Sequence, residues 1–108
     1  MNKQTTPPAP SFEMIYNIAA KAGTEAGKAQ YVAGHGSCGF GWVRIKGNIA
    51  FGRWAKKSGL ASRAYPNGLS FWVSDFNQCE ASKYMYASAF AGILNKHGIQ
   101  ASACSRAD

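Results

Sequence analysis

The 108-residue sequence predicts one α+β domain, with a three- to four-stranded sheet, two helices on one face and an additional N-terminal helix. Three observations predict it: apolar residues at helical spacing after the proline-rich first ten residues, two stretches that alternate as strands do, and capping and glycine signals around a long apolar helix. Hydrophobic residues make up 46% of the chain, enough for one core. We expect residues 1–10 to be a flexible tail and residues 11–108 to form the domain.

The first expected helix begins after Ser11, a residue type that caps helix N-termini. Apolar residues then recur at helical spacing, which gives the helix one apolar face. Two glycines within residues 23–27 lower the helix propensity, so we expect the helix to fade there. A short strand over residues 31–33 and a glycine-rich loop over residues 34–39 follow.

The clearest strand in the first half covers residues 39–46. After it, Asn48 is a suitable N-cap for a short helix that ends at Gly59. Residues 61–68 contain a Pro-Asn-Gly turn and are expected to form a loop. Residues 69–76 alternate cleanly and predict a second strand.

The last two elements form the end of a strand–helix–strand unit. Asn77 and Glu80 make an Asn-x-x-Glu capping pattern that opens a long helix, and Gly98 ends it. Residues 99–105 predict a third strand. A tight turn between this helix and strand favours a crossover that keeps the helix on one face of the sheet.

The two faces of the expected strands differ in chemistry, because side chains alternate along a strand. One face is aliphatic, and the other is aromatic, basic and polar. If helices cover one side only, Trp42 and Trp72 lie on the open side with Arg44 and Lys46. If the N-terminal helix packs on this second face, both indoles are buried in a three-layer sandwich. The pattern leaves both arrangements open.

Charge is concentrated in the middle of the chain. The sequence has 12 Lys and Arg against 5 Asp and Glu, a net charge of +7, and no acidic residue lies between Glu25 and Asp75. Basic groups displace counterions from phosphates, and aromatic rings stack on bases. The sequence therefore predicts a nucleic-acid-binding face. Its candidate members are Phe40, Trp42, Arg44, Lys46, Arg53, Lys56, Lys57, Arg63 and Trp72.

Catalysis is not expected. The letters of GxGxxG at residues 34–39 precede a strand, whereas the dinucleotide fingerprint precedes a helix. GSCGFGW looks like the papain-type signature, but Gly41 stands where that family has its nucleophile. The three cysteines contain no CxxC pair, so neither a zinc ribbon nor a thioredoxin-type motif can form. A metal site could still recruit His35, Cys38, His97 and Cys104, but ordinary histidines and half-buried thiols are favoured, and we expect no metal and no cofactor. We find no apolar run of membrane-spanning length and no secretory pattern, and we expect no membrane partner and a cytoplasmic location with reduced thiols.

Over residues 30–108 the chain resembles a family of short uncharacterised proteins encoded by tailed bacteriophages. The resemblance lies in the runs YVAGHGSCGFGWVRI, GLSFWVSDFNQ, KYMYASAFAGILNKHGI and ASACSRAD. It implies an early-type phage protein in the cytoplasm of a bacterial host, where small basic proteins often bind nucleic acid or obstruct a host machine. It assigns no role to any residue.

Three functional hypotheses follow. The first is a small basic protein that binds nucleic acid through the aromatic and basic face of its sheet. The second is an inhibitor of a bacterial host protein with an acidic surface, because a basic protein also suits such a partner. The third is a binder of small anions, which would use the amides of the glycine-rich loop over residues 34–39.

Overall fold

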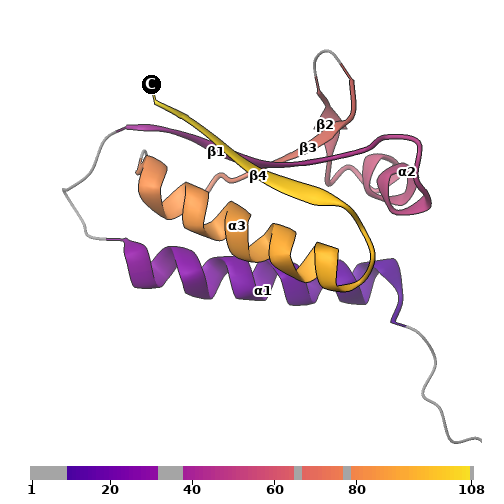
Figure 1. Cartoon of the computed structure of the whole chain (residues 1–108), viewed down its shortest axis with the longest axis horizontal. Coiled ribbons are helices and arrows are strands. Elements are labelled where there is room, and N and C mark those ends of the chain that lie inside the picture. The colour runs from indigo at the N-terminus through magenta and orange to yellow at the C-terminus, as the bar shows by residue number, and fades with distance from the viewer. Residues whose placement is uncertain (1–9, 32–37, 65–66, 77–78, 108) are drawn as a thin grey trace, which may run out of the picture.

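The computed structural model describes residues 10–31, 38–64, 67–76 and 79–107. Within them, four antiparallel strands form one sheet in the order β2-β3-β1-β4, accompanied by three helices (Figure 1). The elements are α1 (Phe12–Gln30), β1 (Gly39–Ile45), α2 (Ala50–Lys57), β2 (Ser62–Arg63), β3 (Leu69–Trp72), α3 (Glu80–Lys96) and β4 (Ala101–Ala107). The expected α+β class and layout are confirmed.

From β1 onward the elements follow the order βαββαβ. The strands β1 and β2 are separated in the sheet by β3, and the strands β3 and β4 are separated by β1. The chain thus contains two interleaved β-α-β units, the ferredoxin-like arrangement. The consequence for the site is that β1 and β3 are the two central strands.

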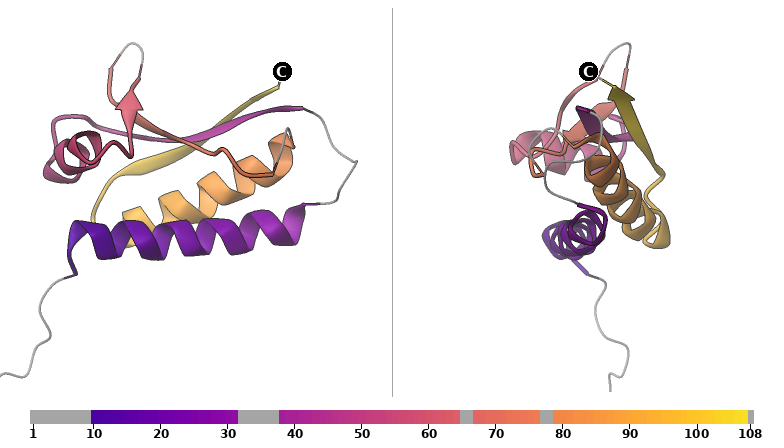
Figure 2. Two further views of the ribbon diagram at one scale, coloured as in Figure 1. Left: turned by 180° about the vertical axis from the view of Figure 1, so that it is seen from behind. Right: turned by 90° about the vertical axis from the view of Figure 1, so that its left-hand side faces the viewer.

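The helices lie on one side of the sheet. Figure 2 shows α1 and α3 on the same side, and none of the described helices lies across the opposite face. The inward residues Val43, Phe71 and Phe90 are buried in one core with Ile15 and Ala19 of α1. Of the two arrangements left open by the sequence, the structure therefore has the sheet covered on one side only.

Small residues allow the helices to approach closely. The helix α1 continues to Gln30, so the expectation that it fades near its glycines is wrong. At Gly23 a Cβ would lie 2.9 Å from the ring of Tyr86, and at Gly27 it would collide with the ring of Phe76. These glycines are contact points, and tertiary packing outweighs their low helix propensity.

The strands differ from their expected bounds. The strand expected over residues 69–76 ends at Trp72, and the chain then turns away through Phe76, whose φ is 68°. The strand expected over residues 99–105 is shifted to Ala101–Ala107, because the amide of Ile99 still donates to the carbonyl of Leu94 in the helix end. Two residues of the expected loop over residues 61–68 form the edge strand β2.

Two expected caps are also wrong. The helix α2 has Ile49 at its N-cap, while the Asn48 carbonyl accepts a hydrogen bond from Arg53. The N-cap of α3 is Cys79, and Asn77 lies outside the described residues. Tyr31, expected to begin a strand, is the C-cap of α1. Residues 1–9 and 32–37, where the tail and most of the loop were expected, also lie outside the described residues.

Candidate nucleic-acid interface

We call the uncovered side of the sheet the open face. Its side chains form three rows across the strands, because directly paired residues point to the same side. The rows are Phe40 beside Arg106, Trp42 between Trp72 and Cys104, and Arg44 between Ser70 and Ser102. None of these eight side chains is acidic. The open face is therefore both aromatic and positively charged.

Three aromatic rings gather at the centre of the open face. The ring centroids of Trp42 and Trp72 are 4.7 Å apart with planes inclined by 31°, and Phe40 meets Trp72 edge-on at 6.4 Å. Such distances are typical of favourable aromatic pairs. The Trp72 side chain nevertheless remains 51% exposed. One indole thus supports the other and leaves a large flat surface toward solvent.

Two cations lie near Phe40. The guanidinium carbon of Arg106 is 5.2 Å from its ring centroid, and the Lys83 ammonium is 5.8 Å from it. Both distances fall within the range of cation–π attraction. Lys83 belongs to α3 on the covered side and is only 6% exposed, and its Cβ packs where Gly41 has no side chain. A positive charge therefore accompanies the aromatic cluster from each side of the sheet.

Arg44 is held in place at the next row. One of its guanidinium nitrogens donates to the backbone carbonyl of Asn67 at 2.8 Å and to the side-chain oxygen of Asn67 at 3.2 Å. Asn67 belongs to the turn between β2 and β3, which is closed by a hydrogen bond from the Ala64 amide to the Gly68 carbonyl. Because an arginine has five N–H donors, most of the guanidinium is still available to a ligand.

The remaining predicted bases lie elsewhere. Lys46 follows the end of β1 and is exposed beside Arg44. By contrast, Arg53, Lys56 and Lys57 lie on α2, which packs Phe51 and Ala55 into the core at one end of the sheet. Arg63 pairs with the buried Leu69 in the edge strand β2 and lies at the same end of the molecule as Lys56, away from α1 and α3.

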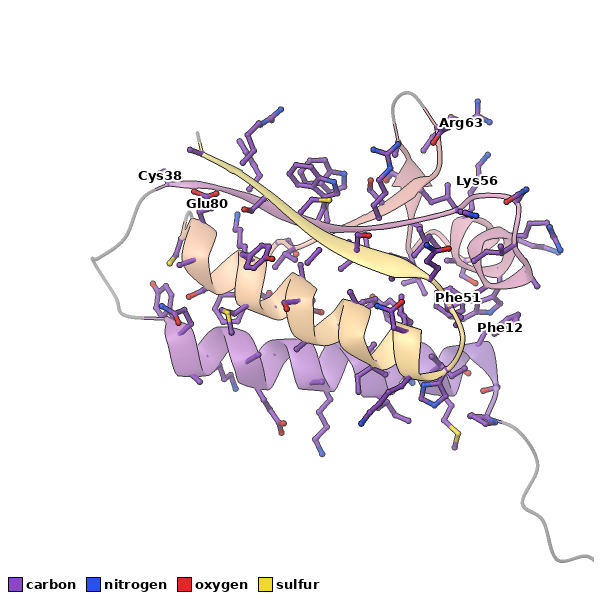
Figure 3. All side chains as sticks on the ribbon, viewed as in Figure 1. Phe12, Cys38, Phe51, Lys56, Arg63 and Glu80 are labelled. Atoms are coloured by element: carbon purple, nitrogen blue, oxygen red, sulfur yellow. The ribbon has the colours of Figure 1, made fainter. Side chains whose placement is uncertain are left out.

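Lys56 and Arg63 lie at the α2 end of the molecule (Figure 3). They line a hollow of about 320 Å³ there. The sequence placed all nine candidates in one group, but the structure brings only Phe40, Trp42, Arg44, Lys46 and Trp72 together. The other four were misplaced because charge density along a chain carries no information about faces.

Three further residues of the interface were missed from the sequence. Arg106 lies beyond the expected strand end at residue 105. Because every second residue of a strand points to the same face, continuing from Ser102 and Cys104 would have predicted Arg106 on the open face. Asn67 was noted as part of a turn, without its role of holding Arg44. Lys83 reaches Phe40 only through the packing of α3 on β1, for which the sequence has no local signal.

Few titratable groups have shifted pKa values. The pKa of the Cys79 thiol lies below its ordinary value, mainly because its sulfur hydrogen-bonds the Ser82 hydroxyl at 3.4 Å. Backbone amides of the same turn and the charge of Lys83 add to this effect. Burial raises the pKa of Tyr16, and burial is also the main cause that raises the pKa of Tyr86 to about 12. Both tyrosines pack against the core, away from the open face.

Among the described residues, no group of three or more His, Cys, Asp or Glu side chains is placed to hold a metal ion. The described helices also include none with the length and apolarity of a membrane span.

No protein-family model, no curated protein and no solved structure matches this chain.

Proposed function

We propose that this protein binds single-stranded nucleic acid on the open face, where Trp72, Trp42 and Phe40 stack on bases and Arg44, Arg106 and Lys46 meet phosphates. The observation that carries this proposal is the exposed Trp72 indole, which is 51% accessible and packs against Trp42 with the ring centroids 4.7 Å apart. The exposed apolar surface of the Trp72 indole, over the centre of an uncovered sheet, is removed from water only when a partner covers it.

The position of the rings favours unpaired bases as that partner. Base–aromatic stacking needs the flat face of a base, which a duplex hides between its neighbours. RNA-recognition-motif domains stack two or three bases on aromatic residues of a four-stranded sheet. Here the rings likewise lie on β1 and β3, the two central strands.

Charge supports the same partner. The open face presents Arg44 and Arg106 and has no acid among its eight paired residues. In proteins that bind single strands, basic side chains contact the phosphate backbone while neighbouring aromatic rings stack on the bases. We place this activity in the bacterial host cell that the resemblance to phage proteins implies.

The test is a titration with single strands of about eight nucleotides, within the site size of sheet-based binders, followed by tryptophan fluorescence. The change Trp72→Ala should weaken binding about 5- to 150-fold, since one stacked base contributes roughly 1–3 kcal/mol. The matched control is Tyr84→Ala, which removes an aromatic side chain that is 42% exposed on α3.

Equal binding by wild type and the Trp72 variant would overturn the stacking proposal, as would equal affinity for duplex and single strands. If no oligonucleotide binds and nuclease-treated bacterial lysate instead yields one stoichiometric acidic protein, the hypothesis of a host-protein inhibitor replaces this one.

A further inference from the structure

A hollow of about 480 Å³ lies at one end of the open face. It is formed where β1 ends, β3 begins and β4 begins, and its lining includes Arg44, Lys46, Asn67, Gln100 and Ser102. Two glycines, Gly47 and Gly68, also line it, together with Ile45 and Asn48. Segments far apart in the sequence thus meet at one polar depression.

The lining of the hollow combines positive charge with hydrogen-bonding side chains. Arg44 and Lys46 supply two positive charges, and no acidic side chain lines the hollow. The amides of Asn67 and Gln100 and the Ser102 hydroxyl can each donate and accept hydrogen bonds, as reading the edge of a base requires. Most ligand hollows are lined mainly by apolar residues, whereas six of the nine residues that line this one have polar or charged side chains.

The hollow is also partly pre-organised. The two hydrogen bonds from Arg44 to Asn67, at 2.8 and 3.2 Å, fix the guanidinium against the wall before any ligand arrives. A donor that is already oriented loses less conformational entropy on binding. Arg44 follows Trp42 by two residues on the same face of β1, a separation of about 7 Å at the usual strand rise.

We propose that this hollow binds one nucleotide of the strand, next to the base stacked on Trp72 and Trp42, and gives the protein a base preference. Lys46 and Arg44 hold the phosphate, while Gln100, Asn67 and Ser102 meet the edge of the base. This inference rests on the proposed function, but the hollow can be tested without an oligonucleotide.

The experiment uses the full chain, labelled for amide NMR, titrated with each of the four common ribonucleoside 5′-monophosphates. We expect shifts of the amides of Gly47, Gly68 and Gln100, and at least about fivefold discrimination between the best and worst base. Inorganic phosphate and a nucleoside without phosphate are the two separate probes, and each should bind about tenfold more weakly than the whole nucleotide.

Two variants separate the parts of the site. Gln100→Ala should remove most of the base discrimination, and Lys46→Ala should weaken all four nucleotides alike. The matched controls are Asn17→Ala and Lys21→Ala, which alter exposed residues of α1 on the covered side. Both controls should bind nucleotides as wild type does.

The outcomes distinguish this inference from the proposed function. If oligonucleotides bind but no mononucleotide shifts the hollow amides, or if Gln100→Ala leaves base preference unchanged, the nucleotide site is refuted while the open-face proposal stands. If mononucleotides bind in the hollow and oligonucleotides do not bind at all, the proposed function fails, and the hollow is a site for free nucleotides and not for one nucleotide of a strand. Equal binding of inorganic phosphate and whole nucleotides would show a phosphate site and refute base recognition.

Discussion

Replacing Gly41 with alanine tests which side of β1 the helices cover. A Cβ at this position would lie 2.8 Å from the Cβ of Lys83 and 2.9 Å from its backbone carbon and oxygen. Because the opposing atoms include backbone, α3 itself must move. Overpacking of this kind costs about 1–3 kcal/mol, and in a domain of this size it lowers the melting temperature by roughly 4–20 °C. Urea and thermal unfolding followed by circular dichroism measure both quantities.

The control is Gly92→Ala in α3. No atom lies within 4 Å of the Cβ that this change adds, so the substitution should stabilise the protein by about 0.5–1 kcal/mol through helix propensity alone. If Gly41→Ala is as stable as wild type while Gly92→Ala behaves as expected, α3 does not pack on this face of β1. The assignment of Trp42 to the uncovered side would then be wrong.

Three further predictions follow from other contacts. The Asn95 side chain accepts a hydrogen bond from the amide of Ala101 and donates one to its carbonyl, each 3.0 Å long. Asn95→Ala should therefore destabilise the protein by about 1–2 kcal/mol in urea unfolding. An unchanged free energy of unfolding would show that this link between α3 and β4 does not contribute to stability. Because the pKa of the Cys79 thiol is lowered, its thiolate forms at lower pH than that of an ordinary cysteine. Its reaction with iodoacetamide should therefore reach half its maximal rate at lower pH, and Ser82→Ala should move that midpoint upward. An unmoved midpoint would contradict the hydrogen bond to Ser82 as the cause of the lowered pKa. Arg106→Ala should reduce the slope of log affinity against log salt for single strands by about 0.7, and an unchanged slope would remove this residue from the phosphate contacts.

Much of the fold could be predicted from local pattern. The alternation around Trp42 and Trp72 correctly separated the two faces of β1 and β3, because a strand has a fixed period of two. The Ser11 cap and the Gly98 turn were also correct, with Ser11 accepting a hydrogen bond from the Met14 amide and Gly98 at a φ of 79°. These features depend on residues close together in the sequence.

The rest depends on contacts between distant segments. Which face stays uncovered was left open, because the position of α1 is decided by its glycines meeting Tyr86 and Phe76. The two-residue strand β2 has too few residues for any periodic signal. For the same reason the bases of α2 and Arg63 were grouped with the open face, although helix packing and the position of β2 place them at the α2 end of the molecule.

Ultraviolet cross-linking of a bound uridine-rich single strand, followed by mass spectrometry of the peptides, tests the central claim most directly. The account predicts adducts within residues 39–46 and 69–76, on or beside Trp42 and Trp72, because stacked bases lie in van der Waals contact with those rings. Adducts confined to residues 50–63, the segment of α2 and β2 that carries Lys56 and Arg63, would contradict it. Nucleic acid would then bind the basic α2 end of the molecule and not the open face.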